Sequence, residues 1–198
     1  MDISHPVLDG LVEMVNIGIG RSAGSLNTLT GHHVTLHIPS IRISSISELK
    51  NETPHFEEPY TAVNQNYHGA FEGTAILVFP RQSAESLFHL MTGESAKTPG
   101  NEELWRMTLI EVANIIVNKV MGSLTNIIGK KVEFEIPEYH EDSFNHILSH
   151  IRQSENKSVA VVRAVFEVSE KDISGEIVIL LTEQSVQVIA QYIADNPV

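Results

Sequence analysis

The sequence contains no cysteine, and its 198 residues carry only 13 Lys and Arg side chains against 25 Asp and Glu side chains. The lack of cysteine excludes disulfides and thiol chemistry. The net charge of −12 argues against a nucleic-acid partner and an anionic membrane surface, because both require a basic face. The sequence has no apolar run of about 18 residues, so it predicts no transmembrane helix. Met1–Gly10 lacks the pattern of a signal peptide. We therefore expect a cytoplasmic protein.

Several motifs of common enzyme classes are also missing. There is no GxGxxG after a predicted strand, no phosphate-binding loop ending in GK[ST], and no GxSxG nucleophile elbow. The glycine-rich stretch Gly18–Gly24 lies inside a predicted helix instead of ahead of one. Because glycine inside a helix costs about 1 kcal/mol relative to alanine, we interpret Gly18, Gly20 and Gly24 as positions of close approach by the sheet or by a partner.

One stretch of the chain occurs twice. Residues Leu11–Pro39 align without a gap to Leu109–Pro137, at a constant offset of 98 residues. A weaker match at an offset of 102 pairs Gly73 with Gly175 and Gln82 with Gln184. Internal similarity over such a long period indicates a duplicated half-domain instead of a solenoid.

Each half predicts the same order of elements: helix, strand, loop, strand, strand, helix. Apolar residues at helical spacing predict long helices from about Pro6 to Gly31 and from Glu102 to Ile128. The strands that follow are expected to end at Pro39 and Pro137, and the polar stretches 40–58 and 138–156 are expected to be loops with a helical turn each.

These elements predict a two-layer α+β fold. Three strands from each half are expected to form one six-stranded, mostly antiparallel sheet with a pseudo-two-fold axis. The chain, residues 1–198, would then be a single domain made of two repeats, at about 7–94 and 102–196.

Each long helix presents a carboxylate and a carboxamide three residues apart. At 100° per residue, Asp9, Glu13 and Asn16 lie within about 60° of one another on the flank of the apolar stripe. Glu111 and Asn114 take the same places in the second copy. Exposed polar residues are usually only solvated, but here both residue types persist in both copies while their neighbours differ. This persistence indicates a functional role.

The spacing resembles the motif of the CheC/CheX/FliY chemotaxis phosphatases: an acidic residue or Ser, then Glu four positions on, Asn after three more, and Pro after a further 23. The first copy matches at Asp9, Glu13, Asn16 and Pro39, and the run Asn16–Leu26 also resembles the first CheC helix. The second copy matches at Glu111, Asn114 and Pro137, but Met107 replaces the leading residue.

The resemblance implies a CheC-like fold and hydrolysis of the aspartyl phosphate of a CheY-type response regulator. It implies that Asn16 and Asn114 orient the attacking water, that Glu13 and Glu111 pair with the regulator's lysine, and that Asp9 assists docking. Pro39 and Pro137 are expected to be structural. The chain needs no cofactor of its own under this hypothesis, because the Mg²⁺ belongs to the regulator.

Two other functions remain open from the sequence. The first is a non-catalytic interaction protein that has the same fold as FliM. Such a protein would bind a response regulator or a CheD-type partner. The duplication is compatible with a monomer and with a dimer. The second is a zinc site, since His146 and His150 are four residues apart and His140, Glu141 or Asp142 could add a ligand. The short predicted helix and the absence of HExxH favour no metal site.

Overall fold

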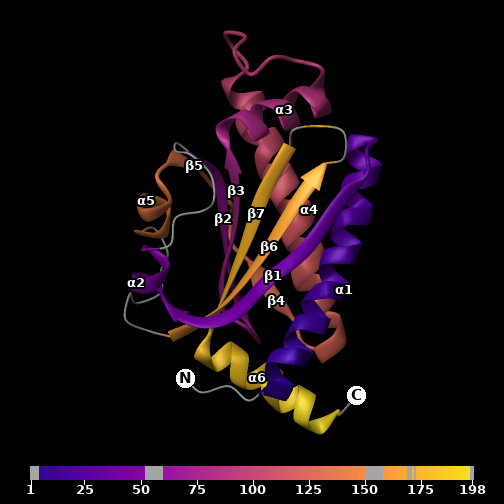
Figure 1. Ribbon diagram of the computed structural model, residues 1–198, viewed down its shortest axis with the longest axis vertical. Coiled ribbons are helices and arrows are strands. Elements are labelled where there is room, and N and C mark those ends of the chain that lie inside the picture. The colour runs from indigo at the N-terminus through magenta and orange to yellow at the C-terminus, as the bar shows by residue number, and fades with distance from the viewer. Residues whose placement is uncertain (1–4, 52–59, 150–157, 169–170, 172, 197–198) are drawn as a thin grey trace.

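The computed structural model describes residues 5–51, 60–149, 158–168, 171 and 173–196 (Figure 1). Its helices are α1 (His5–Thr30), α2 (Ile46–Leu49), α3 (Arg81–Thr92), α4 (Glu102–Ile128), α5 (Phe144–Ser149) and α6 (Glu183–Asp195). Its strands are β1 (Val34–Ser45), β2 (Tyr60–Gly69), β3 (Gly73–Pro80), β4 (Val132–Phe134), β5 (Glu138–Asp142), β6 (Ser158–Val168) and β7 (Ile173–Thr182). The predicted α+β class and both long helices are confirmed.

All strands of both repeats belong to one antiparallel sheet in the order β1-β6-β7-β3-β2-β4, with β5 also paired to β2. The two repeats meet where β3 pairs with β7. There Ile76 lies opposite Val178, which is its own repeat counterpart at the offset of 102. A residue that faces its own counterpart marks the position of the pseudo-two-fold axis in the sheet.

The six expected strand positions hold seven strands, because the outermost position of the second repeat is divided into β4 and β5. The break covers residues 135–137 and ends at Pro137, directly before β5. Pro137 therefore does not end a strand, as predicted, but precedes one. A proline has no N–H to donate to a ladder and is tolerated at such interruptions.

The prediction that the first strand ends at Pro39 is also wrong. Strand β1 continues to Ser45, and its register against β6 shifts between His37 and Ser40. Proline is accommodated at irregularities of this kind, so Pro39 interrupts the ladder without ending it. Part of the expected loop 40–58 is consequently strand; the helical turn expected near Ser47 is present as α2, and residues 52–58 lie outside the described part.

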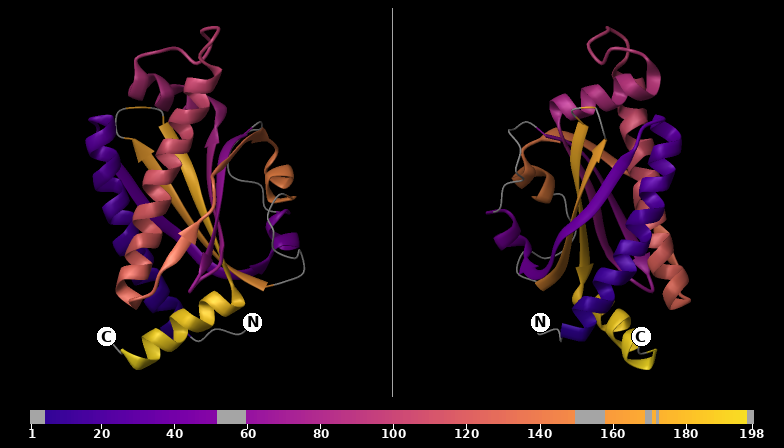
Figure 2. Two further views of the ribbon diagram at one scale, coloured as in Figure 1. Left: turned by 180° about the vertical axis from the view of Figure 1, so that it is seen from behind. Right: turned by 45° about the vertical axis from the view of Figure 1, so that its right-hand side comes forward.

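The two faces of the sheet are covered differently (Figure 2). The long helices α1 and α4 lie side by side over one face, while the short helices α2 and α5 cover part of the other face. The predicted two layers thus gain a partial third one. Because the central strand β3 has both faces buried, it is a continuous apolar run instead of an alternating one, with Leu77 toward α4 and Val78 toward α5.

Helices α1 and α4 cross at close range. A Cβ atom added at Gly18 would lie 2.7 Å from the Cα atom of Val120. On the other side of the crossing, Ser22 donates a hydrogen bond of 3.2 Å to the carbonyl of Ile116. Ile116 and Val120 are the repeat counterparts of Gly18 and Ser22, so the two contacts are symmetry mates and the axis passes through the crossing. The close approach at Gly18 is therefore to a helix, not to the sheet.

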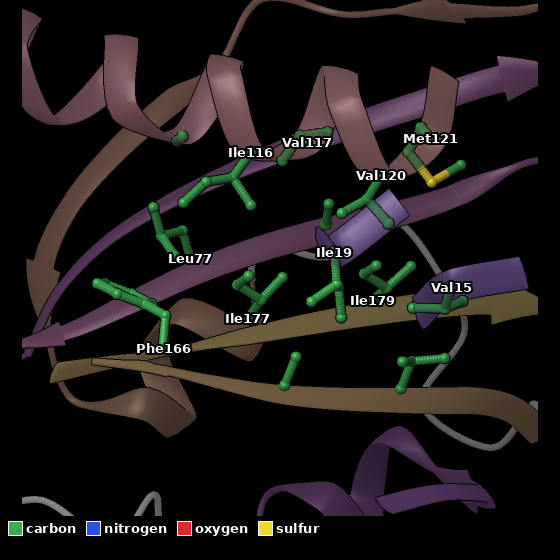
Figure 3. Close-up of a cluster of buried hydrophobic side chains, with 14 of the residues drawn as sticks. Val15, Ile19, Leu77, Ile116, Val117, Val120, Met121, Phe166, Ile177 and Ile179 are labelled. Carbon is green, nitrogen blue, oxygen red and sulfur yellow. The ribbon is translucent and has the colours of Figure 1, made fainter. Parts of the chain in front are cut away.

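The core beneath this crossing joins both helices to the sheet (Figure 3). Figure 3 shows side chains of α4 pointing toward side chains of α1 and of the central strands. Contributors from the helices include Val15, Ile19, Ile116, Val117, Val120 and Met121, and those from the sheet include Leu77, Phe166, Ile177 and Ile179. All are buried, so each helix has one face committed to packing and leaves the opposite face for other contacts.

Among the described residues, α4 is long and apolar enough to cross a membrane by length and composition. However, 56% of its most apolar stretch is buried inside the structure. A helix that is apolar on most sides is typical of a protein core as well as of a membrane. The packing of α4 between α1 and the sheet accounts for its composition.

We predict opposite effects for alanine at two neighbouring glycines of α1. Gly18→Ala should lower the free energy of unfolding by about 1–3 kcal/mol, the usual cost of overpacking, because its Cβ would meet the backbone of α4. Gly20→Ala is the matched control: nothing lies within 4 Å of its Cβ position, so it should raise stability by up to about 1 kcal/mol through helix propensity. Urea unfolding measures both, and equal effects would contradict the close crossing.

Candidate functional site

The first predicted site lies on the exposed side of α1. Asp9, Glu13 and Asn16 are all exposed, while Leu11 and Val15 between them are buried in the core. Within the described part of the chain, the three polar side chains make no hydrogen bond or ion pair. The helix thus carries them as groups that are available to a ligand, since no described residue bonds to them.

The second predicted site is built in the same way on α4. Glu111 is exposed and Asn114 is half-buried, and the buried residues Val112 and Ala113 lie between them in the chain. At the leading position Met107 is 58% exposed. The second copy therefore presents an apolar side chain where the first copy presents a carboxylate.

The structure keeps the two pairs in separate places. Asn16 comes two residues before Gly18 in α1, and Asn114 comes two residues before Ile116 in α4. Since Gly18 and Ile116 are symmetry-related positions at the helix crossing, the pairs flank the crossing from different helices. The arrangement consists of two sites with one Glu and one Asn each, instead of one site with four groups.

A surface groove of about 760 Å³ adjoins the second pair. Helix α4 forms one wall, the C-terminal half of α1 forms another, and β2 and the segment after β4 complete it. Its lining residues are Ser25, Thr28, Leu29, Gln65, Glu111, Asn114, Ile115, Asn118, Lys119, Phe134 and Glu135. Asn114 therefore lies in an open surface groove, where several side chains can contact a group carried by a ligand.

The sequence analysis did not identify Gln65, Lys119 or Glu135 as neighbours of Asn114. Gln65 and Glu135 come from strand β2 and from the break between β4 and β5, and only the sheet register brings these elements together. Lys119 had a detectable signal, because its repeat counterpart Arg21 is also basic. Basic residues are scarce in this chain, so a basic position kept in both copies stands out.

The N-terminal end of α4 is held by a cluster around the single tryptophan. The indole N–H of Trp105 donates to the hydroxyl of Tyr139 and to Glu141, and Arg81 pairs with Glu141 at 2.7 Å. The Arg81 guanidinium also lies 5.4 Å from the centre of the Trp105 ring. Burial and the hydrogen bond to Glu141 raise the pKa of the Tyr139 hydroxyl, which stays protonated and keeps its donor role. This cluster seats the helix that carries Glu111 and Asn114.

The histidines do not form a metal site in the described part of the chain, where no group of three or more potential ligands occurs. His146 lies 2.5 Å from Asp142 through its Nδ1 atom. The backbone amide of Ser143, together with the His146 side chain, lowers the pKa of Asp142. His150, the other half of the predicted pair, lies outside the described residues.

Each pair combines a carboxamide and a carboxylate that are three residues apart on one helix. A carboxamide has a donor and an acceptor on one rigid plane, so it can hold a water molecule and an oxyanion together. A carboxylate one turn away can pair with a cation on the same partner. Together the two groups can position the reactive parts of a bound ligand.

Comparison with known proteins gives the family. The model of the family described as "Chemotaxis phosphatase CheX" matches residues 61–161, a range that contains Glu111 and Asn114 but not Glu13 and Asn16. The flagellar motor switch phosphatase FliY of Bacillus subtilis is 29% identical over 138 residues, which cover 69% of this chain and 36% of that protein. The chain thus spans about a third of that relative's length. The CheY-P phosphatase CheC of Bacillus subtilis is 21% identical over 85% of this chain and 84% of its own.

Solved structures share the fold. FliY of Thermotoga maritima has a TM-score of 0.78 at 19% identity, covering 98% of this chain and 99% of its own. CheX of Borrelia burgdorferi, solved as a CheX-CheY-BeF3-Mg+2 complex, has a TM-score of 0.61 at 15% identity, covering 87% of this chain and 99% of its own. The family model covers half of the chain and includes the second Glu–Asn pair. The chain therefore belongs to the chemotaxis phosphatase family CheX, within the CheC/CheX/FliY group.

Proposed function

We propose that this protein hydrolyses the aspartyl phosphate of a phosphorylated CheY-type response regulator. The observation that carries the proposal is the Glu–Asn pair on the exposed side of a core helix, present in both repeats and placed beside a groove in the second. The family membership supports it, since relatives in the family are named as phosphatases and one was solved with CheY.

Asn16 and Asn114 are assigned to the attacking water. In phosphoryl transfer, alignment and electrostatics supply most of the rate, and a carboxamide can orient the water relative to the phosphoryl group. The buried faces of α1 and α4 hold the two Asn residues on rigid elements, so little conformational freedom is lost when the partner arrives. This rigidity suits a residue whose task is orientation.

Glu13 and Glu111 are assigned to docking through the regulator's lysine, and Asp9 adds a second carboxylate in the first copy. A carboxylate that pairs with a cation near the phosphorylated residue brings the Asn on the same helix face into register. The chain supplies no cofactor under this proposal, because the regulator brings its own Mg²⁺. The proposal places the protein in the cytoplasm, within two-component signalling.

The test is the rate of phosphate release from a phosphorylated CheY-type regulator. Wild type should accelerate release over the regulator's own decay, and Asn16→Ala and Asn114→Ala should each remove the contribution of one site. The double variant should lose about 100-fold or more of the acceleration, as expected for loss of a positioned hydrogen-bonding group. Binding is measured in parallel with the regulator activated by beryllofluoride and Mg²⁺. Binding without any acceleration by wild type would instead favour a non-catalytic interaction protein, and binding of a CheD-type protein would be tested next.

The same variants should leave the fold intact. Because the Asn16 and Asn114 side chains make no hydrogen bond within the described residues, replacing either by alanine should change the free energy of unfolding by no more than about 0.5 kcal/mol. Alanine's higher helix propensity makes a small gain the expected direction. Chemical unfolding measures this, and a loss above 1 kcal/mol, on the order of a broken core contact, would show that these residues serve the structure instead.

A further inference from the structure

The second site lacks the leading carboxylate of its motif, but it contains a carboxylate from another part of the chain. Glu135 follows β4, in the three-residue break before β5, and lines the same groove as Glu111 and Asn114. Its repeat counterpart is His37, so the first site has no acidic residue at that position. At the leading position the first copy has the acid Asp9 and the second has Met107. At the later position the first copy has His37 and the second has the acid Glu135.

The backbone of Glu135 is fixed by strand β2 on both sides. Its N–H donates to the carbonyl of Asn66 at 2.9 Å. Its carbonyl accepts a hydrogen bond of 3.0 Å from the side-chain Nε2 of Gln65. The Asn66 side chain also lies 3.5 Å from the Glu135 carboxylate. A residue in a break between two strands is therefore held as firmly as one inside a strand.

Gln65 is the β2 residue whose side chain holds the backbone of Glu135. It is only 5% exposed, and its Oε1 accepts no hydrogen bond from the described residues. A buried acceptor without a partner is unfavourable for folding. In the other repeat the equivalent position is Ala164, since Gln65 pairs with Ala75 and Ala164 pairs with Ile177, the counterpart of Ala75. Because the other repeat forms the same strand pairing with alanine at this position, the sheet does not require a carboxamide there.

We propose that Glu135 supplies the second carboxylate of the α4 site, in the docking role that Asp9 has in the α1 site, and that Gln65 is the positioning residue that seats it. The inference rests on the proposed function. Its ligand is a cationic side chain of the bound regulator, which Glu111 and Glu135 contact from two walls of the groove. Met107, 58% exposed at the vacated position, then adds apolar contact instead of charge.

The two sites consequently differ in how their two carboxylates are arranged around the regulator's basic residue. The first takes both carboxylates from one helix, along a single line of side chains. The second takes them from α4 and from the sheet edge, with a groove between them. A regulator whose basic residue enters the groove should prefer the second site.

The experiment uses full-length protein with Asn16→Ala, so that hydrolysis proceeds through the second site. Adding Glu135→Gln should raise KM for the phosphorylated regulator about threefold to fivefold, the range for an exposed ion pair, with a smaller effect on kcat. Glu133→Gln is the matched control, since it removes the same charge from an exposed residue of β4 that does not line the groove. Met107→Asp, added to the Glu135→Gln protein, should restore KM by returning a carboxylate to the motif's leading position.

The outcomes separate this inference from the proposed function. Equal KM values for Glu135→Gln and Glu133→Gln would overturn the inference while leaving the phosphatase intact. Glu135→Gln is also made in the Asn114→Ala protein, in which hydrolysis proceeds through the first site. An equal rise in KM there would reveal general damage to the structure and overturn the assignment. If no variant hydrolyses the aspartyl phosphate, calorimetry still tests the docking role, by measuring how the beryllofluoride-activated regulator binds to the Asn16→Ala protein with and without Glu135→Gln. Weaker binding with Glu135→Gln supports the docking role, and unchanged or absent binding contradicts it.

Discussion

The close crossing of α1 and α4 is the constraint on which the rest of the structure depends. Gly18 lets the backbone of α4 approach to a distance at which any side chain would clash, and Ser22 donates a hydrogen bond across the same interface. The crossing lies on the axis that also passes between Ile76 and Val178 in the sheet. With the helices pressed together on this axis, one face of each is committed to the core, and the motif residues are left on the outside.

This division separates stability from function within single helices. Leu11, Val15, Val112 and Ile116 are buried in the core, while the neighbouring Glu and Asn side chains make no hydrogen bond or ion pair with the described residues. Such positions are free to change without loss of stability, which makes their retention in both copies informative. The two sites nevertheless diverged around that common pair. Met107 replaces an acid on α4, and Gln65 and Glu135 line the groove of the second site, whereas their repeat counterparts are Ala164 and His37.

Some features could not be predicted because they depend on the neighbours of an element and not on its own residues. The strand after α1 was expected to end at Pro39, but β6 offers a long partner and the ladder resumes after a register shift. The partial layer of α2 and α5 was not expected, although the sequence of β3 indicates it. Ile76 and Val78 are apolar residues on the second face of β3, so other apolar residues must pack on that face. Local sequence specifies that such a strand is apolar, but not what covers it.

The sequence by itself determined the duplication, the bounds of both long helices, the α+β class and the two Glu–Asn pairs, because helical periodicity and repeated spacing are properties of residues near one another in the chain. Only the tertiary structure decided that Gly18 meets a helix while Gly20 meets nothing, that the pairs lie apart, and that Gln65 and Glu135 stand beside Asn114. These contacts join residues about 20 to 100 positions apart, and helix crossing and strand register set them. No pattern within either segment carries that information.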